Sequence, residues 1–136
     1  MKQCELTQSE MVRRKEVTLK TRKMICNAMS IIAEDESSLM TTYRDFYLQI
    51  SFSELHPLMV FCLARPLEGA FLNLENASNK MNLRSVLGSH AVNEECCCYN
   101  YRATHWLETE MNQKRFFEIL DRCVDEACRG YEKIAS

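Results

Sequence analysis

The spacing of apolar residues along the first third of the chain predicts a helix followed by an acidic loop. Residues 7–33 carry apolar side chains at helical intervals, and the segment from Thr7 to Glu10 has the pattern of a capping box at the start of a helix. Residues 1–12 are mostly polar, so we expect them to be frayed. The acidic stretch 34–38 then ends the predicted helix.

Three strands are predicted next. The segment 39–43 is short and β-prone, and 46–52 alternates between apolar and polar positions, as a half-buried strand does. The third segment, 58–64, is apolar at nearly every position, which is typical of a strand covered on both faces. Arg44-Asp45 supplies the turn between the first two strands.

Residues 67–82 have the spacing of a second helix, and asparagine recurs in it every third residue from Asn73 to Asn82. Asparagine is unfavourable inside a helix because its side chain competes for backbone hydrogen bonds. We therefore expect some of these side chains to bond to neighbouring backbone. This interpretation is favoured over a ligand site built from asparagines.

A hairpin is predicted from two strands, 83–90 and 96–107, around a turn at 91–95. One face of its second strand is the more apolar and should lie under the helices: Cys97, Tyr99, Tyr101, Ala103, His105 and Leu107. The opposite face carries Cys96, Cys98, Asn100, Arg102, Thr104 and Trp106. A tryptophan on the less apolar face indicates either a contact at the end of the sheet or an exposed interaction patch.

Residues 112–135 have the clearest helical pattern in the chain. The apolar stripe consists of Phe116, Leu120, Cys123, Val124, Ala127, Tyr131 and Ile134. The charged residues are expected to be mostly solvent-facing: Lys114, Glu118, Asp121, Arg122, Asp125, Glu126 and Lys133. The resulting order, α-β-β-β-α-β-β-α, predicts an α+β fold with an antiparallel sheet of about five strands and helices packed on it.

The size of the chain fits one domain over residues 1–136, with no internal repeat and no linker. The formal net charge of -2 provides no general attraction to nucleic acid or to an anionic membrane, although residues 1–23 are locally basic. The longest apolar run, 57–64, is too short to span a bilayer, and the first residues lack the apolar stretch of a signal peptide. We therefore expect a cytoplasmic protein without a membrane or nucleic-acid partner.

Eight cysteines are the main candidates for chemistry. In a reducing cytosol most cysteines act as small buried residues rather than as disulfides. Cys96, Cys97 and Cys98 would point to alternating faces of a strand, so they are not expected to bind one tetrahedral metal. A redox role for Cys96 or Cys98 requires a stabilised thiolate, and a Cys–His hydrolase requires a third orienting group. With only three glycines there is no phosphate-binding loop, so we expect no metal, no cofactor and no enzyme activity.

The run from Asn76 to Asn82 leading into the hairpin, together with the closing helix 116–134, resembles the YbjN-like family and its structural relatives, the type III secretion chaperones. Asn76 and Asn79 form the nearest approach to a family motif. The resemblance implies the α+β fold and non-enzymatic protein binding, often as a homodimer. Secretion chaperones wrap an extended, unfolded segment of a partner over sheet and helix surfaces. The basic first helix departs from the typically acidic chaperones.

Two functional hypotheses follow. The first is a non-enzymatic, chaperone-like or regulatory protein-binding module of the bacterial cytoplasm, which we expect to be a homodimer. Its predicted interaction residues are Arg102, Trp106, Cys96 and Cys98. The alternative is a redox-responsive or small-ligand-responsive regulator that uses the hairpin cysteines. An enzyme of another type would require a pocket that contains groups with perturbed pKa values.

Overall fold

The computed structural model describes residues 7–53, 56–68, 79–107 and 111–135. Six antiparallel strands form one sheet in the spatial order β1-β2-β3-β4-β6-β5. The elements are α1 (Gln8–Ala28), β1 (Ala33–Glu34), β2 (Ser38–Tyr43), β3 (Phe46–Phe52), β4 (Leu58–Pro66), β5 (Ser89–Asn93), β6 (Cys98–Trp106) and α3 (Gln113–Ala135). A short helical turn over 79–82 precedes β5. The predicted α+β fold is confirmed, and the short β1 adds a strand to the expected five.

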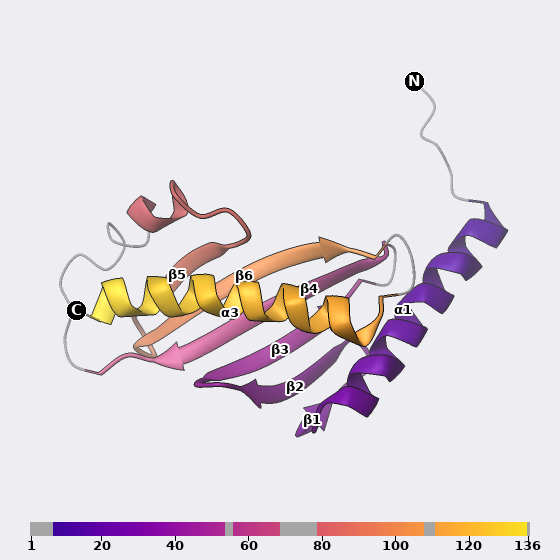
Figure 1. Ribbon diagram of the computed structural model, residues 1–136, viewed down its shortest axis with the longest axis horizontal. Coiled ribbons are helices and arrows are strands. Elements are labelled where there is room, and N and C mark those ends of the chain that lie inside the picture. Colours follow the sequence, from indigo (N-terminus) through magenta and orange to yellow (C-terminus); the bar gives the residue numbers. More distant parts are fainter. Residues whose placement is uncertain (1–6, 54–55, 69–78, 108–110, 136) are drawn as a thin grey trace.

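One face of the sheet forms the core together with the helices. Figure 1 shows α3 lying lengthwise over the sheet, with α1 at the end of the sheet where α3 begins. The largest fully buried side chains come from the sheet and both helices: Tyr99, Tyr101, Phe46, Phe61, Phe116, Ile25, Leu39, Leu48, Ile50, Met59, Leu63 and Leu107. Alternation along β3 and β6 therefore places every second side chain in the core, as predicted.

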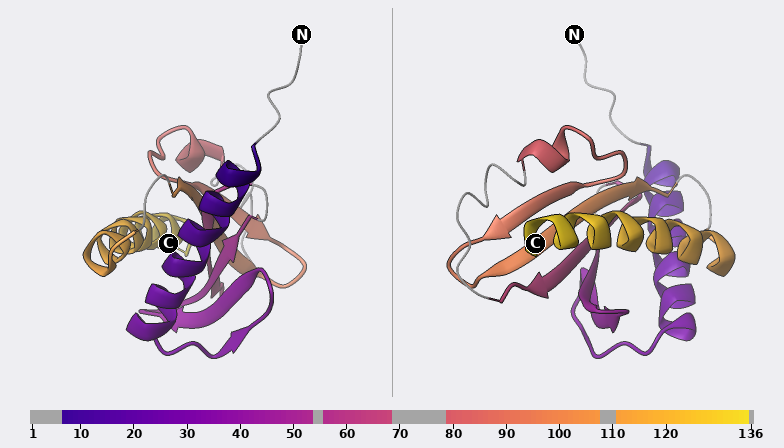
Figure 2. Two further views of the ribbon diagram at one scale, coloured as in Figure 1. Left: turned by 90° about the vertical axis from the view of Figure 1, so that its right-hand side faces the viewer. Right: turned by 60° about the vertical axis from the view of Figure 1, so that its left-hand side comes forward.

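β4 differs from its prediction. Its apolar residues on both faces indicated a strand covered on both sides. Within the described residues, helices cover only one face of the sheet, and Val60, Cys62 and Ala64 on the other face remain half-buried. The two views in Figure 2 show α3 and α1 with the sheet beside them. Apolar side chains at these positions thus lie on a face that the described helices leave open.

The first helix ends earlier than predicted. Thr7 caps its start by accepting a hydrogen bond from the Glu10 N–H at 3.2 Å, as expected. Its last residue is Ala28 rather than Ala33, because Met29 is already extended. Ala33 then pairs with Met40 of β2, so the end of the predicted helix becomes the edge strand β1.

The hairpin is shifted toward the C-terminus relative to the prediction. Residues 83–88 form no strand, β5 begins at Ser89, and the turn occupies 94–97 instead of 91–95. Cys97 has a φ of 50°, a left-handed turn conformation. Cys96 and Cys97 therefore belong to the turn, and only Cys98 lies in β6.

The closing helix follows its predicted pattern except at Tyr131 and Glu126. Its predicted stripe is buried apart from Tyr131, which is half-buried. Asn112 precedes the helix and accepts a hydrogen bond from the Arg115 N–H at 2.8 Å. Glu126 was predicted to face solvent, and this is wrong, since only 8% of it is exposed. Among the described helices, none is long and apolar enough to cross a membrane.

Candidate functional site: an open sheet face, a helix groove and a basic cavity

The sheet face opposite the core exposes two large aromatic side chains. Tyr47 is 63% and Trp106 is 61% exposed, and Met40, on β2 opposite Gln49, is 37% exposed on the same face. The strand register places Gln49, Cys62 and Arg102 in one row across the middle of this face. We call this surface the open face. It carries apolar contact area that no described helix covers.

The predicted interaction residues lie along one strand rather than in one cluster. Trp106 is at the end of β6 beside Leu58, whereas Cys98 is at the other end beside Pro66. Eight residues of extended strand separate them, about 26 Å at 3.3 Å per residue. Arg102 lies between them and is exposed. The structure therefore places Trp106 and Cys98 at opposite ends of β6.

The Trp106 side chain lies next to a groove beside α1, and His56 contacts both. The His56 ring contacts the Trp106 ring edge-on, with 6.1 Å between ring centroids. His56 also lines a cavity of about 460 Å³ between α1 and the adjoining end of the sheet. The other lining residues are Arg14, Lys15, Thr18, Leu19, Arg22, Glu36, Ser37, Phe52 and Ser53. The exposed indole and this α1 groove thus form a connected surface.

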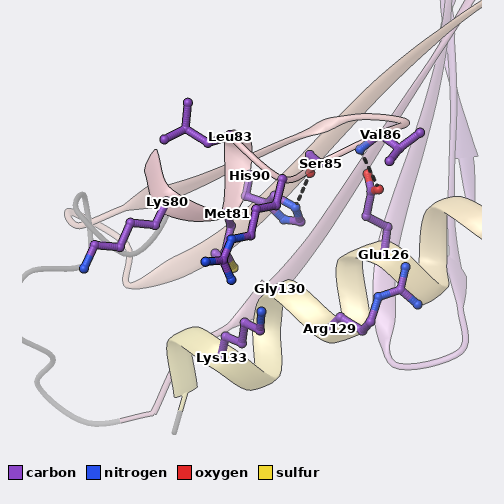
Figure 3. Close-up of a pocket in the computed structure, with 11 residues that line it drawn as sticks. Lys80, Met81, Leu83, Ser85, Val86, His90, Glu126, Arg129, Gly130 and Lys133 are labelled. Atoms are coloured by element: carbon purple, nitrogen blue, oxygen red, sulfur yellow. Dashed lines mark hydrogen bonds between the residues drawn. The ribbon is translucent and has the colours of Figure 1, made fainter.

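A second cavity, of about 490 Å³, lies between α3 and the segment that leads into β5 (Figure 3). Sequence reasoning did not predict it. Its lining residues are Lys80, Met81, Leu83, Arg84, Ser85, Val86, His90, Glu126, Arg129, Gly130 and Lys133. We call it the basic cavity, because four lysine and arginine side chains line it against a single carboxylate.

The carboxylate of Glu126 fixes the wall of the basic cavity. It accepts hydrogen bonds from the N–H groups of Val86 at 3.0 Å and Gly88 at 2.9 Å, and from the Leu87 N–H at 3.2 Å. The Tyr101 hydroxyl donates a further bond at 2.8 Å. Burial alone would raise the pKa of Glu126, but these donors together lower it below its usual value. Because these three N–H groups bond to a side chain, residues 86–88 are not part of the β5 ladder.

A chain of hydrogen bonds runs from the cavity into the core. Ser85 Oγ lies 2.7 Å from His90 Nε2, and His90 Nδ1 bonds to the hydroxyl of Tyr99. Burial lowers the pKa of His90 and raises that of Tyr99, so both groups are neutral at pH 7. The order Ser–His–Tyr has the connectivity of a hydrolase triad, but its third member is uncharged.

Hydrolysis would also require donors for an oxyanion. The nearby backbone N–H groups of 86–88 are already occupied by the Glu126 carboxylate. These nearby N–H groups of the described chain are therefore not free to stabilise a tetrahedral intermediate beside the Ser85–His90 pair. We interpret this chain as a structural network that orients the wall of the basic cavity.

Cys123 and His105 form a cysteine–histidine contact in the described part of the chain. The Cys123 sulfur lies 3.7 Å from His105 Nε2. The thiol is fully buried, and this burial raises its pKa to about 11. Burial also lowers the pKa of His105. A protonated, inaccessible thiol is a poor nucleophile, so this pair belongs to the core.

The hairpin cysteines occupy the turn and the first residue of β6. Burial raises the pKa of Cys98, and the neighbouring Cys96 raises it further. This direction opposes thiolate formation and gives no support to a low-pKa redox thiol at Cys98. Among the described residues, no group of three or more His, Cys, Asp or Glu side chains is placed to hold a metal ion.

The asparagine pattern has one member with a defined role. Asn76 lies outside the described residues, and Asn79 is exposed in the helical turn. Asn82, by contrast, donates to the His90 carbonyl at 2.9 Å and accepts from the His90 N–H at 2.6 Å. The expectation that some asparagines bond to neighbouring backbone is confirmed by Asn82.

Comparisons with known proteins agree on the fold. No protein-family model and no curated protein matches the sequence. Among solved structures, the chain is similar to YbjN from E. coli, a candidate transcription regulator, with a TM-score of 0.60 and 12% identity over 82% of this chain and 86% of that one. It is also similar to a chain of the HopA1–SchA chaperone–effector complex, with a TM-score of 0.58 and 9% identity over 94% and 99% of the two chains.

A third similar structure is the type III secretion chaperone SycH of Yersinia pestis, solved in complex with a fragment of YscM2. Its TM-score is 0.57, at 12% identity over 83% of this chain and 98% of that one. The predicted resemblance to YbjN and the secretion chaperones is thereby confirmed for the fold. Identities this low carry no residue-level assignment.

Proposed function

We propose that this protein is a non-enzymatic binding module that holds an extended segment of another protein. The observation that carries the proposal is the continuity between the exposed Trp106 indole, the His56 ring and the α1 groove. Tryptophan is among the residues that contribute most to protein interfaces, because it buries a large rigid surface with little loss of conformational entropy. A connected aromatic surface and groove suits an extended chain better than a compact ligand.

The chemistry of the described site supports binding over catalysis. The buried Cys123 thiol has a raised pKa, and in the described part of the chain the N–H groups of residues 86–88 beside the Ser85–His90 pair are already bonded to Glu126. The fold likeness points the same way, since SchA and SycH were each solved in complex with a protein. We therefore extend a chaperone-like or regulatory protein-binding role to this chain.

The proposal also covers the location and the oligomeric state of the protein. We infer that it works in the bacterial cytoplasm as a homodimer, as the resemblance to secretion chaperones implies. Light scattering of the purified protein under reducing conditions measures the mass directly. The proposal predicts twice the 15.9 kDa mass of one chain, and a strictly monomeric protein would contradict this part of it.

The test of the binding surface is partner recovery from the cytosol of the source organism under reducing conditions. We expect the wild-type chain to retain one dominant protein in stoichiometric amount. Trp106→Ala should reduce its recovery about tenfold, because loss of a central aromatic contact weakens binding by roughly 1.4 kcal/mol or more. Tyr47→Ala is the matched control, since Tyr47 is equally exposed on the open face but remote from the α1 groove.

The result that would contradict this site is equal recovery of the same partner by Trp106→Ala and wild type. Recovery of no protein at all would contradict the proposed function itself and shift weight to a small ligand. Both variants carry their substitutions at exposed positions, so the fold should be retained in each.

A further inference from the structure

The basic cavity concentrates positive charge in a protein whose formal net charge is -2. Lys80 and Arg84 come from the segment before β5, whereas Arg129 and Lys133 come from α3 (Figure 3 labels all of these except Arg84). Lys80, Arg84 and Arg129 are exposed. Within the described parts of the chain, none of these three forms an ion pair with a carboxylate.

The one carboxylate in the cavity does not neutralise these cations. Glu126 is buried, and its oxygens accept the backbone N–H groups of residues 86–88 and the Tyr101 hydroxyl. Its hydrogen-bonding capacity is thus directed at the wall of the cavity and not at the guanidinium and ammonium groups. The cavity consequently presents an unbalanced positive charge to whatever enters it.

The cations are arranged in two rows. Lys80 and Arg84 are four residues apart, and Arg129 and Lys133 are four residues apart on α3, where such side chains are neighbours on the helix surface. Leu83 and Val86 line the same cavity and are 88% and 86% exposed. The two side chains therefore add exposed apolar surface beside the cations.

We propose that the basic cavity binds an acidic peptide segment that also carries apolar side chains. Carboxylates of the segment would pair with Lys80, Arg84 and Arg129, and its apolar side chains would cover Leu83 and Val86. This inference rests on the proposed function, because it specifies the chemistry of a protein partner, but it concerns a different surface from the α1 groove.

The arrangement favours a peptide over a small anion such as phosphate. A single anion requires cations that converge on one point, whereas these cations are spread along two elements on either side of the cavity. A small anion would also leave Leu83 and Val86 in water. A peptide with alternating acidic and apolar side chains satisfies both features at once.

The test is fluorescence anisotropy of the purified full chain with a short fluorescein-labelled peptide rich in Glu and containing Leu. Binding should weaken at least about tenfold when Glu is replaced by Gln in the peptide, and also in the double variant Arg84→Glu, Arg129→Glu. The matched control is Lys23→Glu, Lys114→Glu, which changes the net charge equally at exposed positions on α1 and at the start of α3. It should bind within about twofold of wild type.

A second pair of variants tests the apolar part. Leu83→Ser, Val86→Ser should weaken binding several-fold, whereas Ile32→Ser, at a residue 70% exposed near β1, should not. Equal peptide binding by wild type and the charge-reversal variant would overturn the proposal. Displacement of the peptide by inorganic phosphate would also overturn the proposal if it needed far lower concentrations than displacement by chloride at matched ionic strength. That result would assign a small-anion site.

The two proposals fail separately. If the acidic peptide does not bind but partner recovery still depends on Trp106, the protein-binding function stands and the cavity assignment falls. If the peptide binds as predicted but partner recovery does not depend on Trp106, the proposal for the α1 groove fails. The assignment of the basic cavity then stands.

Discussion

Glu126 is the residue on which the geometry of the basic cavity depends. Its side chain joins α3 to residues 86–88 and to Tyr101, and so holds three segments together through one carboxylate. The helical pattern grouped it with the solvent-facing charges. The available signal was its position, three residues after Cys123 and four before Gly130, both of which are buried. A sequence pattern does not reveal which backbone groups such a carboxylate will meet.

Replacing Glu126 should measurably destabilise the fold. In Glu126→Gln the amide presents an N–H₂ group to backbone N–H donors that require an acceptor, so we expect a loss of roughly 1–3 kcal/mol in the free energy of unfolding. Urea denaturation followed by circular dichroism measures it. Glu118→Gln, at an exposed position of the same helix, should change stability by less than about 0.5 kcal/mol. Equal stability of the two variants would contradict the role assigned to Glu126.

The lowered pKa of Glu126 predicts that the protein loses stability in acid. Its pKa in the folded protein is lowered from the ordinary 4.5, so the folded state holds the ionised form more strongly than the unfolded state does. The contribution is therefore complete above pH 4.5 and is lost as the pH falls through the folded-state pKa. Urea midpoints measured from neutral pH downward should fall less steeply for Glu126→Gln than for wild type. Parallel profiles would contradict this prediction.

The cysteines should differ sharply in reactivity with a thiol reagent. Cys123 is fully buried with a pKa raised to about 11, whereas Cys26 and Cys96 are exposed. In the native protein Cys26 should react readily and Cys123 only after unfolding. Mass spectrometry of alkylated peptides reads out each site. If Cys96 or Cys98 reacted much faster than Cys26, the redox-responsive alternative would be favoured.

At the scale of the elements, Asn82 protects the exposed edge of the sheet. β5 is an edge strand, and the N–H and C=O of His90 are bonded by the Asn82 side chain instead of by another strand. Edge strands with free backbone groups pair readily with other chains, and natural proteins block them. The opposite edge is the two-residue β1, which offers little length for pairing.

Removing this block should promote self-association. In Asn82→Ala the backbone groups of His90 become available at the β5 edge, and we expect larger species to appear with increasing protein concentration in analytical ultracentrifugation. Asn79→Ala is the matched control, because Asn79 is an exposed asparagine in the same helical turn. An unchanged sedimentation profile for Asn82→Ala would show that Asn82 does not prevent other chains from pairing with β5.

Sequence periodicity predicted best those elements that bury one face along their whole length. β3 alternates along its whole length, and α3 carries a complete apolar stripe. The errors occurred where a hydrogen-bonding partner in another element decides the structure. Ala33 becomes a strand by pairing with Met40, and residues 86–88 leave the hairpin because Glu126 takes their N–H groups. Neither the pairing of Ala33 with Met40 nor the hydrogen bonds of Glu126 leaves a periodic pattern of apolar residues that the sequence could show.

At the scale of the whole molecule, the candidate site was predictable only in part. The alternation of β6 correctly placed Trp106 and Arg102 on the open face. The α1 groove and the basic cavity arise from residues far apart in the sequence, such as Arg14 with His56 and Lys80 with Arg129. Such surfaces exist only once the helices and the sheet have packed together. The fold therefore provides the two binding surfaces that the proposals assign.

The most direct test of the central claim uses the intrinsic fluorescence of Trp106, the sole tryptophan of the chain. In the free protein its exposed indole should emit as in water and be quenched efficiently by iodide. In the purified complex with the recovered partner, we predict an emission shift to shorter wavelength and a clear loss of quenching, after subtraction of the partner's own signal. A stoichiometric complex in which Trp106 keeps its emission and its full accessibility to iodide would contradict binding at this surface.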